Sequence, residues 1–135
     1  MKRDIEVREV SDLGIAVVSG SDTEKGKIWD VYLVNMKRSA IANVLVNVSG
    51  RSGAGSQAGQ HTATLRYYFA EIAAESWVHV EALLPEVMQL DNLYWVSFQH
   101  EGYLFDKKYT VPKDPERVAE MWLIPLINKV GMWFE

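Results

Sequence analysis

The segment 50–60 (GRSGAGSQAGQ) is the first place to look for a ligand-binding loop, because it consists largely of glycine, serine and alanine. Gly53, Gly55 and Gly59 are of the type that lets backbone amides hold a phosphate at the start of a helix. A P-loop, however, ends in Gly-Lys-Ser or Gly-Lys-Thr, and no lysine lies in this segment. We therefore expect a flexible hairpin loop, with Gly53 and Gly55 as candidates for the rim of a pocket beside it.

The three histidines, His61, His79 and His100, are the residues that suggest a metal site. Zinc bound without cysteine requires about three histidine or carboxylate ligands within roughly 2.0–2.2 Å of one point. Strand alternation directs His79 away from Val78 and Val80, whereas His61 and His100 share the apolar faces of their strands. The sequence therefore predicts no metal site, and leaves His61 and His100 as candidates for a pocket rim at one end of the fold.

No residue pattern for nucleophilic catalysis occurs in this chain. The Gly-x-Ser-x-Gly motif is absent, and there is no cysteine. Carboxylates in or beside expected strands could act as acids or bases, but solvation of the surface explains them equally well. They are Asp30, Glu71, Glu75, Glu81 and Asp106. The sequence thus predicts that the protein is not an enzyme and uses no cofactor.

Composition narrows the classes of partner. The 135 residues are 48% hydrophobic and 24% charged, which is typical of one globular domain spanning residues 1–135. The net charge is −4, and basic residues cluster only as pairs such as 37–38 and 107–108, so we expect neither nucleic acid nor membrane as a partner. The charged N-terminal residues do not form a secretory signal, and no segment is apolar enough to span a membrane. A cytoplasmic location is the simplest interpretation.

Most of the chain alternates between apolar and polar residues, as half-buried strands do. Turn residues separate these segments, and the helices that a parallel α/β sheet requires are missing. The pattern predicts a mostly-β fold: a two-sheet antiparallel β-sandwich of immunoglobulin-like architecture, with the strand order open. The expected strands are 13–19, 28–35, 40–49, 61–69, 75–83, 93–99 and 103–111.

One short helix is expected at 114–122. Asp114 is a suitable N-cap, Pro115 suits the first helical position, and Met121 and Trp122 follow at helical spacing. The tail 126–134 is too apolar to be a free end. We expect it to dock as an extra strand or to pair with another chain.

The tryptophans are the unusual feature of the composition, with five in a chain of this length. Trp29 shares a face with core residues, whereas Trp77 and Trp95 lie opposite the main apolar faces of their strands. Exposed large aromatics favour protein interfaces. Trp77, Trp95, Trp122 and Trp133 are therefore candidates for a partner surface, unless the helix and the tail cover them.

Five segments resemble a known family when they are read in order. They are 2–7 (KRDIEV), 29–35 (WDVYLVN), 94–98 (YWVSF), 106–109 (DKKY) and 124–126 (IPL). The chain resembles a family of short uncharacterised bacterial proteins, some of which carry the label phenylalanyl-tRNA synthetase alpha subunit. The resemblance implies a shared fold. It carries over no synthetase residue, because the arginine-bearing motifs that grip ATP in a synthetase are absent here.

Three functions remain open at this point. The leading hypothesis is a non-enzymatic cytoplasmic protein-interaction module that binds a protein partner or itself. The alternative is a small-ligand-binding or enzymatic domain with a pocket at the end of the sandwich. A tRNA-related role follows from the family label alone.

Overall fold

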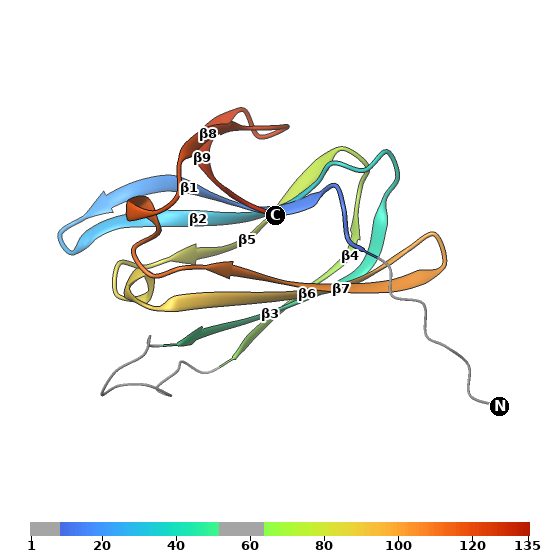
Figure 1. Ribbon diagram of the computed structural model, residues 1–135, viewed down its shortest axis with the longest axis horizontal. Coiled ribbons are helices and arrows are strands. Elements are labelled where there is room, and N and C mark those ends of the chain that lie inside the picture. Colours follow the sequence, from blue (N-terminus) through green and yellow to red (C-terminus); the bar gives the residue numbers. More distant parts are fainter. Residues whose placement is uncertain (1–8, 52–63) are drawn as a thin grey trace.

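The computed structural model describes residues 9–51 and 64–135, which are mostly β-strand (Figure 1). The described residues form two antiparallel sheets, which confirms the predicted two-sheet arrangement. The strands are β1 (Leu13–Thr23), β2 (Gly26–Asn35), β3 (Ile41–Arg51), β4 (Leu65–Ile72), β5 (Ser76–Leu83), β6 (Asp91–His100), β7 (Tyr103–Val111), β8 (Met121–Ile124) and β9 (Lys129–Phe134).

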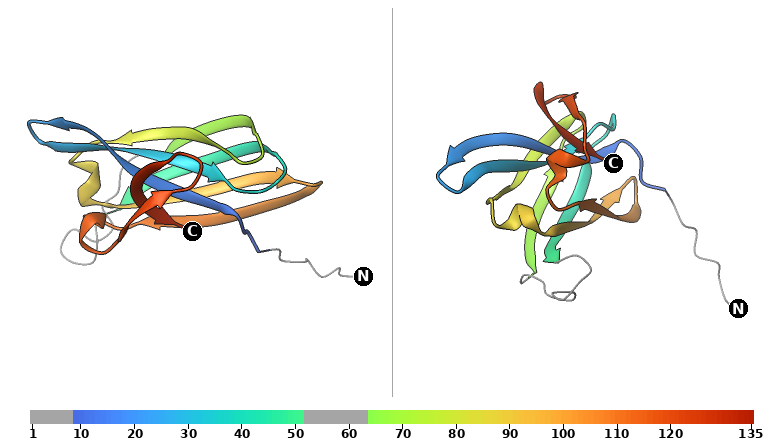
Figure 2. Two further views of the ribbon diagram at one scale, coloured as in Figure 1. Left: turned by 90° about the horizontal axis from the view of Figure 1, so that it is seen from above. Right: turned by 60° about the vertical axis from the view of Figure 1, so that its left-hand side comes forward.

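The two sheets contain unequal numbers of strands. One has the order β5-β2-β1-β9-β8 and the other the order β4-β3-β6-β7. Figures 1 and 2 show them as two layers, with the β8–β9 hairpin rising away from the four-stranded sheet. At one side β5 packs against β4, and at the other β9 packs against β7. β8 lies beyond β9 and is the fifth strand, without a counterpart in the other layer.

The core lies between the sheets and follows the predicted alternation. In β3, Val44, Val46 and Val48 are buried, as their shared parity predicts. Tyr94 and Phe98 of β6 are the largest fully buried side chains among the described residues. Bulky aromatics in the central strands therefore fill the space between the sheets.

Two polar side chains hold the layers together from inside. The Asn35 amide donates hydrogen bonds to the carbonyl oxygens of Ile72 and Ala73, at 3.3 and 3.0 Å. The Tyr109 hydroxyl, on β7, donates to the carbonyl oxygen of Leu13, on β1, at 2.9 Å. Because a buried polar group without a partner is costly, these bonds fix how the sheets are placed on one another.

The helix expected at 114–122 is wrong. Only Pro115–Arg117 forms a 3-10 turn, and β8 begins at Met121. Asp114 has a left-handed backbone (φ 44°) and makes no side-chain capping bond. Met121 and Trp122 instead pair with Met132 and Gly131 of β9, so pairing with the tail overrides the helical spacing. The described residues include no helix with the length and apolarity needed to cross a membrane.

The apolar tail docks as a strand, one of the two outcomes expected for it. β9 pairs with β1, with Phe134 opposite Ile15 and Gly131 opposite Val18. A Cβ atom at Gly131 would lie 2.7 Å from the carbonyl oxygen of Val17, so only glycine permits this close approach. The tail thereby covers β1, which would otherwise be an edge strand.

Candidate functional site

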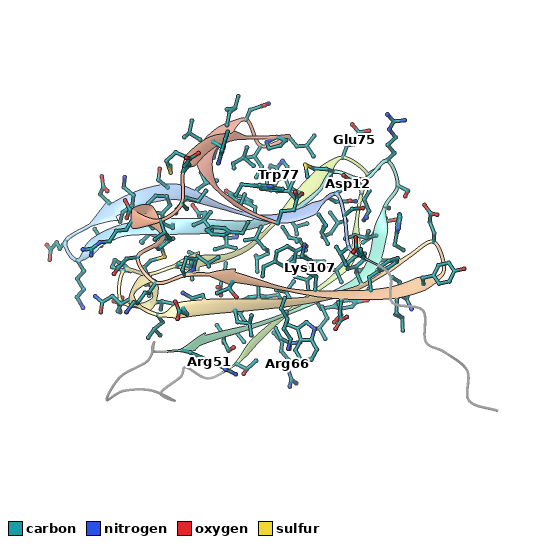
Figure 3. All side chains as sticks on the ribbon, in the orientation of Figure 1. Asp12, Arg51, Arg66, Glu75, Trp77 and Lys107 are labelled. Carbon is teal, nitrogen blue, oxygen red and sulfur yellow. The ribbon has the colours of Figure 1, made fainter. Side chains whose placement is uncertain are left out.

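The four tryptophans predicted to form a partner surface do not lie together. Trp122 is on the edge strand β8 and Trp133 is half-buried on β9, whereas Trp77 is on β5 at the opposite edge of the same sheet. Trp95 is on β6, in the other sheet. Figure 3 shows Trp77 on the side of the five-stranded sheet, away from Arg51 and Arg66 on the far side of the other. The structure therefore does not bring the four tryptophans together on one surface.

Trp77 and Trp95 are each held by neighbours from their own sheet. The Trp77 ring meets the Tyr32 ring edge-on, with centroids 5.2 Å apart. The Trp95 indole nitrogen donates to Asp106 at 2.9 Å, and the Lys108 ammonium lies 4.7 Å from the ring centroid. Both side chains are about 40% exposed (42% and 41%), but these contacts account for their positions without a partner.

The exposed apolar residues concentrate instead around β8. Met121 (48%), Leu123 (67%) and their neighbour Val130 on β9 (54%) are all exposed, although their parity is that of the buried Met132. They are exposed because the four-stranded sheet ends before it reaches β8. Trp122, on the opposite face of β8, and Val118, which precedes the strand, are also exposed. We call these exposed apolar residues at the edge, Val118, Met121, Trp122, Leu123 and Val130, the β8 edge patch.

A second feature is a pocket between the sheets, at the end where β3 and β5 finish. Its volume is about 540 Å³. Its walls come from β3, β4, β5, the 3-10 turn Val87–Gln89 and β6. Leu65 and Leu84 are half-exposed members of the lining. Most of the other lining side chains are apolar, and Tyr67, Glu81 and Asn92 are the exceptions.

Glu81 is the polar centre of this pocket. One carboxylate oxygen accepts a hydrogen bond from the Tyr67 hydroxyl at 2.8 Å, and the other accepts from the Tyr94 hydroxyl at 2.7 Å. Burial, together with the hydrogen bond to Glu81, raises the pKa of Tyr67 to about 12. Burial and the Glu81 charge raise the pKa of Tyr94 well above its ordinary value. Both phenols therefore keep their protons and donate to the carboxylate at neutral pH.

The sequence missed Glu81, because strand alternation predicts it on the solvent face beside His79. The pairing of β2 with β5 contains a β-bulge: Tyr32 pairs with His79, but Val31 pairs with Glu81. The bulge adds Val80 as one extra residue and turns the following side chain to the other face. Glu81 consequently faces the buried Tyr94. Nothing in the residue pattern of β5 signals a bulge.

The histidines that the structure describes have ordinary partners. His79 lies 2.9 Å from the Asp30 carboxylate, and His100 lies 2.6 Å from the Ser39 hydroxyl. His100 is at the opposite end of β6 from Asn92, which lines the pocket, so it does not border that pocket. Gly53, Gly55 and His61, the other candidates for the rim, lie outside the described residues. Residues 9–51 and 64–135 contain no group of three or more side chains that could hold a metal ion.

Comparisons with known proteins place no constraint on these two features: no family model matches the chain, and neither the curated proteins nor the solved structures contain a match.

Proposed function

We propose that the protein is a non-enzymatic interaction module whose binding element is the β8 edge patch, and that its partner is a second copy of the same chain. The observation that carries this proposal is an exposed, uncharged strand at the free edge of a sheet. In this proposal the module is cytoplasmic, and its sandwich is immunoglobulin-like because the chain passes repeatedly from one sheet to the other.

β8 is short but lacks the charges and proline that protect edge strands. Unpaired backbone groups at a sheet edge recruit another strand unless charges, proline or a bulge prevent it. The other three edge strands contain charges, namely Arg66 and Glu71 in β4, Glu81 in β5, and Asp106, Lys107 and Lys108 in β7. β8 reads Met-Trp-Leu-Ile, with neither charge nor proline. It is the edge best suited to pair with another strand.

The fold restricts how two β8 strands can pair. Two identical strands joined by a two-fold axis perpendicular to the sheet run antiparallel and keep their faces aligned. Residues of equal parity must then lie opposite each other. An axis between the two copies of Trp122 places each Trp122 opposite its copy and Met121 opposite Leu123. Every residue of β8 then lies opposite a residue of the second copy. The paired sheet would contain ten strands and would continue the exposed apolar surface across the axis.

The charges beside β8 are complementary in this register. Glu120 lies opposite Ile124 of the second copy, and Ile124 pairs with Lys129 within its own hairpin. Glu120 and the other copy's Lys129 then flank one isoleucine on the same face, two strand spacings apart, or roughly 10 Å between Cα atoms. The two-fold axis repeats this arrangement. No like charges face each other, so the register is favoured electrostatically.

The test is the solution mass by light scattering over a roughly hundredfold range of concentration. We expect a monomer–dimer equilibrium in which Leu123→Lys, with its charge beside the axis, weakens association by about tenfold or more. Leu104→Lys is the matched control, since Leu104 is an exposed leucine on the edge strand β7. This control should associate as the unmodified protein does.

A charge exchange tests the register itself. Glu120→Lys should weaken the dimer, and the double variant with Lys129→Glu should recover part of the loss, because the two positions would again carry opposite charges. A monomer over the whole range, or equal behaviour of the variants at Leu123 and Leu104, would contradict the proposal. The protein would then have to bind a different protein through this edge or use another surface.

A further inference from the structure

The inter-sheet pocket has the dimensions of a small-molecule site and is separate from the β8 edge patch. Pockets that hold small organic ligands have volumes of about 300–1,000 Å³, with apolar walls and a few polar groups that orient the ligand. This pocket has about 540 Å³. Val48, Val80, Leu83 and Val87 contribute apolar wall, and Glu81 is the charged residue among the described residues of the lining.

The Glu81 carboxylate has capacity for a further donor. A carboxylate offers about four acceptor positions, and the hydroxyls of Tyr67 and Tyr94 each occupy one. No lysine, arginine or histidine in residues 9–51 and 64–135 forms an ion pair with Glu81. Both neighbours are neutral phenols. The negative charge thus lies in an apolar pocket with hydrogen-bond donors around it but no described counter-ion.

We infer that this pocket binds a small organic cation, with a primary ammonium group at Glu81 and an apolar chain along the valine and leucine walls. The ammonium group supplies the charge and the hydrogen-bond donors that the free acceptor positions of Glu81 require. The Tyr67 ring also lines the pocket and can contribute a cation–π contact. The apolar chain gains from leaving water against the pocket walls.

Two other classes of ligand fit the pocket less well. An organic anion would be repelled by Glu81, and none of the described residues that line the pocket is basic and could offset that repulsion. A neutral apolar molecule would cover the carboxylate without replacing the water that solvates it, which is costly. The charge of the ligand should therefore decide binding among molecules of equal length.

The experiment compares three probes with the same six-carbon chain: hexylammonium, 1-hexanol and hexanoate. Each is titrated into the full chain and followed by amide chemical shifts of residues 80–84. We expect hexylammonium to shift these amides and to bind at least about tenfold more tightly than hexanol, with no binding of hexanoate. Glu81→Gln should reduce the affinity for hexylammonium to that for hexanol. Glu71→Gln, a change of an exposed carboxylate on β4, should leave it unchanged.

A second variant covers the case in which Glu81→Gln does not fold. Leu84 is half-exposed and lines the pocket, so Leu84→Lys adds a positive charge there without disturbing the core. It should weaken binding of hexylammonium and leave hexanol unaffected. Equal affinity of the unmodified protein for hexylammonium and hexanol would overturn the inference, as would undiminished binding in either pocket variant. The dimerisation test at Leu123 does not depend on these outcomes.

Discussion

The two sides of the sandwich are finished in different ways. On one side β5 packs against β4, and the Glu81 carboxylate of β5 accepts a hydrogen bond from Tyr67 of β4, so a polar contact bridges the two sheets. On the other side β9 packs against β7, and β8 extends beyond them. On the first side the edge strands of the two sheets contact each other. On the second side the apolar strand β8 is exposed to solvent.

The difference follows from the unequal strand numbers. The four strands of the smaller sheet can cover only four strands of the larger one. The inward-facing residues of the fifth strand, β8, therefore have no opposing layer. β7 illustrates how an edge is normally protected, since Lys107 pairs with the buried Val96 and so faces inward, between the sheets in Figure 3. A charge in this position discourages pairing with another chain. The overhang of β8 is thus specific to one edge, and this is the edge that we propose for self-association.

The largest effect is expected from a matched pair of methionines. Met132 and Met121 are opposite each other on β9 and β8, but Met132 is fully buried and Met121 is half-exposed. Met132→Ala should reduce the free energy of unfolding by about 2–5 kcal/mol, the usual cost of a core cavity. Met121→Ala should reduce it by less than about 0.5 kcal/mol. Urea denaturation measures both, and equal losses would show that β8 is covered after all.

The next largest effect is expected at Gly131. Its substitution by alanine would place the new methyl group against the Val17 carbonyl oxygen and push β9 away from β1. We expect a loss of about 1–3 kcal/mol in the free energy of unfolding, as for other overpacked sites. Hydrogen exchange should also become faster at the amides of β8 and β9. An unchanged denaturation midpoint would mean that the approach of β9 to β1 is looser than described.

The pH dependence of stability tests the side where β5 packs against β4. The pKa of Tyr67 is raised to about 12, and that of Tyr94 is raised well above its usual value. In the unfolded chain these phenols ionise near pH 10, so the unfolded state loses protons first. The free energy of unfolding should therefore be unaffected by them below about pH 10 and should fall between about pH 10 and 12. Tyr67→Phe should flatten this fall, and an identical slope in the variant would exclude Tyr67 as its source.

The smallest effect on stability is expected from removing the protection of β7. Lys107→Val should change the free energy of unfolding by no more than about 0.5 kcal/mol, since Lys107 is only partly buried at an edge. Its effect should appear in light scattering as larger species at high concentration, because β7 would then resemble β8. If no larger species form, the charges of Asp106 and Lys108 are sufficient to protect this edge.

Strand alternation predicted much of the fold, because the burial of one face imposes a period of two on each strand. The hairpin at Gly102 and the burial of Trp29 also follow from local patterns. The prediction of a helix at 114–122 failed because the four apolar residues 121–124 fit a strand as well as one turn of helix. Only pairing with β9 decides between the two.

Neither functional feature could be predicted from the sequence. The position of Glu81 depends on a bulge in the pairing of β5 with β2, which requires knowledge of the register. The exposure of Met121 and Leu123 depends on which strand lies at an edge without an opposing layer. The uncharged run from Met121 to Ile124 was the available signal, but an edge strand and a core strand can share such a sequence.

The docking of β9 on β1 also bears on how the chain folds. β1 is a core strand, yet its second neighbour comes from the far end of the sequence, with Phe134 opposite Ile15. During synthesis the edge of β1 stays open until β9 emerges, and a pairing this distant in sequence forms slowly. The nascent chain would therefore expose the backbone edge of a core strand for a long time, and we expect it to be open to chaperones and proteases until β9 closes the sheet.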